Sequence, residues 1–106
     1  LEFFFPLSTG IKRFGAAEPR KLQLHPAYPN PFNAEVTLEF SLPRPERVSL
    51  AIYNIRGEMV EQWAQQDLQE GRYRQRWTAA GRPSGLYVYR LRAGADVRTG
   101  RVLLLR

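Results

Sequence analysis

Few side chains of this 106-residue chain could take part in catalysis. His25 is the only histidine and there is no cysteine, so a nucleophilic triad or a zinc site with imidazole or thiolate ligands lacks its parts. The closest acidic pairs, Glu35 with Glu39 and Glu58 with Glu61, fall on predicted strands that turn them to solvent. No glycine-rich phosphate loop or calcium-binding loop is present. The sequence therefore predicts a chain that is not an enzyme and that holds no cofactor or metal.

Positive charge offers a second kind of chemistry, because the formal net charge is +6 at pH 7 and most of the basic residues are arginines. Net charge speaks to encounter rates rather than to a site, and we expect no nucleic-acid partner. Five arginines recur at every second position of two predicted strands, so each row shares one face. If those strands are neighbours, the rows form a basic stripe for phosphate or sulfate groups; otherwise they are solvated faces that oppose edge pairing. These candidate anion contacts are Arg72, Arg74, Arg76, Arg90 and Arg92.

Aromatic side chains offer a third kind of chemistry, the binding of sugars. Trp63, Tyr28 and Tyr73 could together build a platform for sugar rings. The alternative is that these side chains lie in the core, as aromatic residues on strands usually do. The sequence leaves both interpretations open.

Short β-strands must position these side chains, because apolar and polar residues alternate with a period of two along most of the chain. The polar segment 65–70 is predicted to be a loop. Seven strands are predicted, at 22–24, 36–42, 48–53, 59–63, 72–77, 86–91 and 97–105. This pattern predicts an all-β fold, a seven-stranded antiparallel β-sandwich of the immunoglobulin or fibronectin type III kind, with a small barrel as the alternative.

One face of these strands is apolar and is predicted to form the core. Burying each large aliphatic side chain contributes ~1.5 to 3 kcal/mol, so such a core can offset the chain entropy of one domain. The predicted core residues are Val36, Leu38, Phe40, Val48, Leu50, Ile52, Val60, Trp77, Tyr87, Tyr89, Leu91, Val102 and Leu104.

The segment from Tyr28 to Asn33 reads Tyr-Pro-Asn-Pro-Phe-Asn, and its two prolines exclude both a helix and a central strand. It is predicted to be a shaped loop with Tyr28 and Phe32 as apolar anchors. Asn30 and Asn33 are expected to bond to neighbouring backbone in Asx-type turns. Taken alone, the segment fits a well-packed crossover at the edge of the domain.

Residues 1–21 show neither the helix nor the strand period and are predicted to be an irregular linker or arm from an upstream protein. Residues 22–106 form one domain. The run Phe3–Phe5 is too short for a secretory signal, and the start at Leu1 suggests a piece of a longer or processed chain. Without cysteine, the domain has no disulfide framework.

Four segments, taken in order, carry a resemblance to a known family. They are 28–33 (Tyr-Pro-Asn-Pro-Phe-Asn), 53–60 (Tyr-Asn-Ile-Arg-Gly-Glu-Met-Val), 83–91 (Pro-Ser-Gly-Leu-Tyr-Val-Tyr-Arg-Leu) and 102–106 (Val-Leu-Leu-Leu-Arg). Asn54 and Gly57 in the second are also typical of the first and fourth positions of a tight hairpin turn. Together the segments resemble the C-terminal sorting domain of the type IX secretion system (the Por secretion system), which is related to the immunoglobulin-like domain of flagellar hook-capping proteins. The resemblance covers residues 22–106.

The resemblance implies a non-catalytic targeting domain that directs secretion, by way of the periplasm, and cell-surface attachment of an upstream cargo, often a secreted hydrolase. It implies as partners an outer-membrane translocon, a surface sortase and anionic lipopolysaccharide or another surface glycan. Cargo linkage or cleavage would then fall in the arm around Gly15 to Lys21. The residues assigned to the sorting signal in this way are Tyr28, Pro29, Asn30, Pro31, Phe32, Asn33, Asn54, Gly57, Gly85, Tyr87, Leu103, Leu104, Leu105 and Arg106.

Two other functions fit parts of the sequence. The aromatic residues favour a carbohydrate-binding module. The predicted sandwich fits a structural immunoglobulin-like module that serves as a spacer or in assembly.

Overall fold

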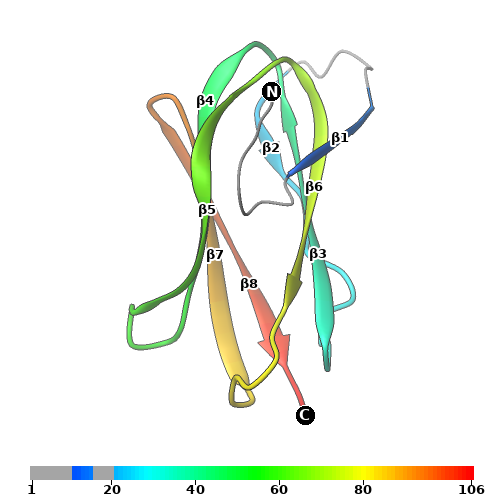
Figure 1. Ribbon diagram of the computed structural model, residues 1–106, viewed down its shortest axis with the longest axis vertical. Helices are drawn as coiled ribbons and strands as arrows, with labels where there is room; N and C mark the ends of the chain where they lie inside the picture. The colour runs from blue at the N-terminus through cyan, green and yellow to red at the C-terminus, as the bar shows by residue number, and fades with distance from the viewer. Residues whose placement is uncertain (1–10, 16–20) are drawn as a thin grey trace.

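The computed structural model describes residues 11–15 and 21–106, and the regular structure in this part of the chain is β-strand without helix (Figure 1). Two four-stranded antiparallel sheets lie face to face, with strand orders β1-β6-β3-β2 and β5-β4-β7-β8. None of the described residues forms a helix long and apolar enough to cross a membrane. The strands are β1 (Lys12–Gly15), β2 (Gln23–Leu24), β3 (Glu35–Leu42), β4 (Glu46–Tyr53), β5 (Met59–Leu68), β6 (Gly71–Thr78), β7 (Gly85–Ala93) and β8 (Asp96–Leu104).

The core lies between the two sheets, and the alternating pattern of the sequence places it there. In β6 every second residue is buried, and β3, β4 and β7 bury most of their alternate residues in the same way. Aromatic rings fill much of the space: Phe40 stacks on Tyr73, and Trp77 meets Tyr87 edge to face at 5.3 Å between centroids. All the predicted core residues are buried except Val60, which is partly buried and packs against the others. The prediction of an all-β fold with this core is confirmed.

Residues 11–15 and 21–106 form eight strands where the sequence predicts seven, because β1 forms inside the predicted arm. It pairs with the start of β6 at the edge of the sheet. Ile11, just before it, is buried in the core, and the ring of Phe14 lies under the guanidinium of Arg74, 3.9 Å from Cζ. Four residues are too few to show a period, so the sequence contains no signal for this strand. Residues 1–10 and 16–20 of the predicted arm, with Phe3–Phe5, lie outside the described residues.

The segment predicted as a loop at 65–70 belongs mainly to β5, which continues to Leu68. Backbone pairing with β4 carries it there, with Asp67 opposite Arg47 and Leu68 opposite Glu46. An irregularity in the register after Val48 breaks the alternation of side chains. The loop prediction is therefore wrong for 65–68, because the strand is held by its neighbour rather than by an apolar face.

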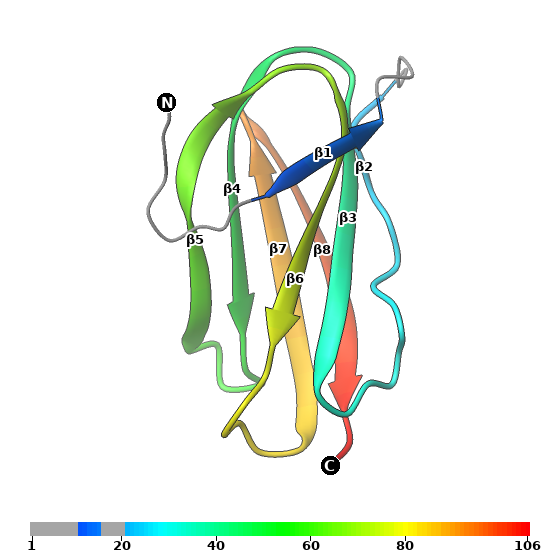
Figure 2. The ribbon, with the colours of Figure 1, turned by 45° about the vertical axis from the view of Figure 1, so that its right-hand side comes forward.

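The connections gather at the two ends of the sandwich (Figures 1 and 2). At the end that carries the C-terminus lie the loop before β3, the β4–β5 turn and the β6–β7 connection, at the bottom of both views. Strand β1 lies towards the other end. This separation places the four segments of the family resemblance close together.

Candidate functional site

The loop 28–33 lies along the end of β8 and bonds to it through backbone and side chain. The amide of Phe32 donates to the carbonyl of Leu103 at 2.9 Å, and the amide of Leu105 donates to the carbonyl of Phe32 at 2.8 Å. Asn30 Oδ1 accepts from the amide of Leu103 at 3.0 Å, and Asn30 Nδ2 donates to the carbonyl of Arg101 at 3.3 Å. The loop therefore covers the end of β8, which is an edge strand in its sheet.

The two asparagines of this loop do not act as predicted. Asn30 bonds to β8 rather than to its own neighbours, so the Asx-turn prediction is wrong for it. Asn33 makes no side-chain hydrogen bond within residues 11–15 and 21–106 and lies in a surface groove. Nothing in the local sequence distinguishes an asparagine that closes a turn from one that bonds to a distant strand.

Phe32 is an apolar anchor, as predicted, and Tyr28 is not. The Phe32 side chain is buried, with its centroid 5.7 Å from that of Trp77. Tyr28 is 45% exposed, and its hydroxyl donates to the carboxylate of Glu39. This hydrogen bond raises the pKa of Tyr28 above its ordinary value, because loss of the proton would place two negative charges side by side.

Arg106 joins the end of β8 to the β6–β7 connection. Its amide donates to Ser84 Oγ at 2.9 Å, and its guanidinium donates to the carbonyls of Arg82 and Ala79. Gly85, the first residue of β7, pairs with Leu104. The third and fourth segments are thus directly connected.

The β4–β5 turn is the second segment, and the predicted hairpin is confirmed. The amide of Gly57 donates to the carbonyl of Asn54 at 3.0 Å. Asn54 Oδ1 accepts from the amides of Arg56 and Glu58 at 2.9 and 3.0 Å. Gly57 has a φ of 84°, a conformation that a side chain would strain.

Asn54→Ala is expected to lower the free energy of unfolding by about 1–2 kcal/mol, because two turn amides lose their acceptor while remaining open to water. Chemical denaturation followed by tryptophan fluorescence measures the change. Ile55→Ala is the matched control, since Ile55 lies in the same turn and is 75% exposed. Equal stability of the two variants would contradict a role of the Asn54 side chain in holding the turn.

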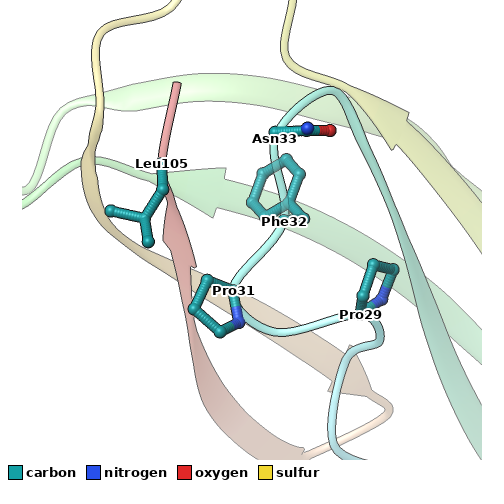
Figure 3. Close-up of a pocket in the computed structure, with 5 residues that line it drawn as sticks. All are labelled: Pro29, Pro31, Phe32, Asn33 and Leu105. Carbon is teal, nitrogen blue, oxygen red and sulfur yellow. The ribbon is translucent and has the colours of Figure 1, made fainter.

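Two shallow grooves hollow this end of the sandwich. The first holds about 390 Å³ and is lined by Pro29, Pro31, Phe32, Asn33 and Leu105. Figure 3 shows Leu105, from the end of β8, beside the loop that carries the other four. The second holds about 330 Å³ and lies between the β4–β5 turn and the β6–β7 connection, with Ile55 and Leu86 among its lining. Leu105 is 49% exposed at the first groove and Ile55 is 75% exposed at the second, so apolar surface is open to solvent at both.

The fourteen candidate signal residues separate into three groups at this end, according to their burial. Phe32, Tyr87 and Leu104 are buried and hold the fold, and the Tyr87 hydroxyl donates to the carbonyl of Pro83 at 2.7 Å. Leu103, Asn54 and Gly85 are partly buried. The exposed members are Tyr28, Pro29, Asn30, Pro31, Asn33, Gly57, Leu105 and Arg106. Ile55 and Leu86, which the sequence prediction did not include, add apolar side chains to the exposed surface.

The predicted aromatic platform for sugars does not form. Trp63 and Tyr73 are buried in the core and belong to different sheets. Burial also raises the pKa of Tyr73. Only Tyr28 of the three is exposed, so the platform prediction is wrong.

The two arginine rows do not merge into one stripe, because β6 and β7 belong to different sheets. Along β6, Arg74 Nε lies 3.9 Å from Glu39 Oε2, and Arg76 Nη1 lies 3.8 Å from Glu35 Oε2. The second row, on β7, lies on the outer face of the other sheet. The condition for a continuous basic stripe is not met.

A histidine and a serine come together in sheet β1-β6-β3-β2, with His25 Nε2 3.0 Å from Ser41 Oγ. Ser41 is buried, so a substrate cannot approach its hydroxyl. Among the described residues, no group of three or more acidic or histidine side chains is arranged to hold a metal ion. The geometry of this pair gives it a structural role.

A family model for the secretion system C-terminal sorting domain, the tail read by the type IX (Por) system, matches residues 26–104. The chain belongs to this family. No curated protein matches the chain. As a type IX sorting domain, it serves export by way of the periplasm to secretion or cell-surface attachment, and it interacts with the type IX machinery. Such domains are typically non-catalytic. Strand β1 lies before the matched range of the sorting domain, and Leu105 and Arg106 follow it.

Proposed function

We propose that this sorting domain is a non-catalytic module, formed by residues 22–106, that directs secretion and surface attachment of an upstream cargo such as a secreted hydrolase. The outer-membrane translocon and a surface sortase are its proposed partners. Membership of the type IX family supports this assignment. The arm around Gly15 to Lys21 is the proposed place of cargo linkage or cleavage.

We call the surface formed by residues 28–33, 54–57, 83–86 and 103–106 the motif end. It is the proposed recognition surface. The observation that carries this proposal is the hydrogen bonding of the 28–33 loop to Leu103 and Leu105, which brings segments from the two ends of the matched range together. The exposed apolar side chains beside the two grooves give a partner a surface to bury.

The proposal is tested by fusing the 106-residue chain behind a signal peptide and a fluorescent cargo in a host with an active type IX system. The double variant Ile55→Ser, Leu105→Ser is expected to reduce extracellular cargo by about tenfold, as loss of two apolar contacts at an interface implies. Its stability should stay within about 0.5 kcal/mol of the parent, because both side chains lie outside the core, 75% and 49% exposed.

Val97→Ser is the matched control, because Val97 is 40% exposed and lies at the other end of β8. Export of this variant should equal that of the parent. Retention of the parent fusion in the periplasm would contradict the sorting role. Undiminished export of the stable double variant would instead contradict recognition through the motif end.

We also propose that β2 to β8 correspond to an immunoglobulin or fibronectin type III arrangement. The strand orders β2-β3-β6 and β5-β4-β7-β8 support this proposal, since labelling these strands A, B, C, C′, E, F and G in chain order gives sheets ABE and C′CFG. In this view β1 is an addition beyond β6. A purely structural role is then the second candidate function, and preserved export of every motif-end variant would favour it.

A further inference from the structure

The outer face of the β5-β4-β7-β8 sheet carries a cluster of arginines on its last two strands. On β7, Tyr89 and Leu91 are buried. Arg90 and Arg92 alternate with them, so their side chains point away from the core. On β8, Arg101 precedes the buried Val102 and points the same way. Arg101 is absent from the candidate anion contacts predicted from the sequence, because its strand shows no arginine row.

Strand register places Arg92 and Arg101 on either side of Arg90. Arg90 lies opposite Thr99, so Arg101, two residues further along β8, is its diagonal neighbour at about 7–8 Å. Arg92 is two residues from Arg90 along β7, a separation of about 7 Å. Two hydroxyl residues share the face, since Thr99 lies opposite Arg90 and Ser49 on β4 lies opposite Arg92. Two apolar residues share it as well, with Val97 opposite Arg92 and Val88 opposite Arg101. The result is a group of hydrogen-bond donors spaced along β4, β7 and β8.

One of the three cations is already held in place. Arg90 Nη2 donates to the hydroxyl of Tyr53, and its Cζ lies 4.9 Å from the centroid of that ring. A guanidinium fixed in this way loses less conformational freedom when an anion binds.

The charge of this cluster is not neutralised by the part of the chain that the structure describes. Within residues 11–15 and 21–106, no carboxylate forms an ion pair with Arg90, Arg92 or Arg101. Asp67 on β5 shares the face, and it is paired with Arg47 at 3.1 Å. On β6, by contrast, Arg74 and Arg76 face carboxylates on β3, and Phe14 covers Arg74. The arginine row on β6 is longer, but its guanidinium groups are less available to an anion than those on β7 and β8.

We propose that the surface formed by Arg90, Arg92 and Arg101, the arginine face, binds an acidic polysaccharide through its carboxylate, phosphate or sulfate groups. Guanidinium groups form strong charge-assisted hydrogen bonds with such anions, and a polymer can engage several at once. The adjacent hydroxyls of Ser49 and Thr99 suit the hydroxyl groups of sugar rings. This surface shares no residue with the motif end, which it adjoins where Asn30 donates to the carbonyl of Arg101.

A polysaccharide fits this face better than a membrane or a protein does. Membrane binding by a basic surface requires apolar side chains that enter the lipid, and protein partners require apolar anchors at the centre of the interface. The cross-strand neighbours of Arg90 are the small Ala51, which is buried, and Thr99. Val97, which is 40% exposed, and Val88 lie at the margin of the face, opposite Arg92 and Arg101. The centre of the arginine face offers polar contacts rather than an apolar anchor.

The test is affinity electrophoresis and calorimetry of the purified 106-residue chain with dextran sulfate and polygalacturonate, with neutral dextran as the blank. The triple variant Arg90→Gln, Arg92→Gln, Arg101→Gln is expected to bind about tenfold or more weakly, since three charge-assisted contacts are lost. The matched control, Arg72→Gln, Arg74→Gln, Arg76→Gln, removes the same charge from the opposite outer face. The affinity of this control should fall by less than about threefold, because only the long-range effect of net charge is lost.

Equal weakening of the two triple variants would overturn the proposal, because binding would then follow net charge. Failure of the parent to bind either acidic polysaccharide would also overturn it, as would binding only to phosphatidylglycerol vesicles or to inorganic phosphate. Should the triple variant fold poorly, Arg92→Gln, Arg101→Gln retains the Arg90–Tyr53 contact and is expected to weaken binding by about fivefold. Because binding is measured on purified protein, failure here is separate from failure of export.

Discussion

Phe32→Ala is expected to destabilise the domain by about 3–5 kcal/mol, the usual cost of removing a buried phenylalanine. Phe32 comes from a loop, yet its side chain closes the space between the sheets. It packs on Trp77 of one sheet, and its backbone forms a parallel bridge with Leu104 of the other. Removal of the ring leaves a cavity that a proline-flanked loop cannot collapse to fill. Thermal unfolding is expected to show a fall of more than about 10 °C.

Leu105→Ala is the control for this variant, since Leu105 lines the same groove and its side chain is half-exposed. It should change stability by less than about 0.5 kcal/mol. A Phe32→Ala protein as stable as the control would show that the loop is a peripheral crossover rather than part of the core.

Gly100→Ala is expected to destabilise the domain by about 2–4 kcal/mol through overpacking and loss of hydrogen bonds. A Cβ at Gly100 would lie 2.4 Å from Cζ and 2.5 Å from the hydroxyl oxygen of Tyr89 on the neighbouring strand. That hydroxyl accepts from the amide of Ala27 at 2.9 Å and donates to the carbonyl of His25 at 3.2 Å. The ring thus links the two sheets, and burial raises its pKa. Displacing it leaves a buried amide without a partner.

A double-mutant cycle with Tyr89→Leu isolates this contact. In the Tyr89→Leu background, Gly100→Ala should cost less than about 1 kcal/mol, because the clashing atoms are gone. Thr99→Ala, at an exposed neighbouring position of β8, controls for a general effect of changing the strand. Additive effects of the two substitutions would contradict a close approach of Tyr89 to Gly100.

The sequence predicts strands well where one face meets the core and poorly where backbone pairing alone decides. Alternation identified β3, β4 and β6 because Leu38, Leu50 and Tyr73 and their alternate neighbours are buried. The extension of β5 to Leu68 depends instead on pairing with β4 across a register irregularity. Strand β1 depends on the free edge of β6. Neither depends on a pattern within its own residues.

The sequence predicts which residues form the candidate site, but it does not predict the contacts that they make. The motif segments identify the residues, and the Asn54 turn follows from local turn chemistry. The bonds from Asn30 to β8 depend on how two distant segments meet, which local sequence does not encode. The same reason separates the arginine rows, because neighbours in a sandwich are set by topology. Aromatic side chains were ambiguous until burial assigned Trp63 and Tyr73 to the core.

The hydrogen bonds from Asn30 and Phe32 to the end of β8 also determine when the motif end can exist. Asn30 and Leu103 are 73 residues apart in the chain, and contacts of such long range form only after the entropy of closing a large loop has been overcome. A nascent chain that stops before residue 103 has the opening segment but not the surface. The motif end thus forms only in a chain that includes residue 103, because a peptide of residues 28–33 lacks the partners of Asn30 and Phe32.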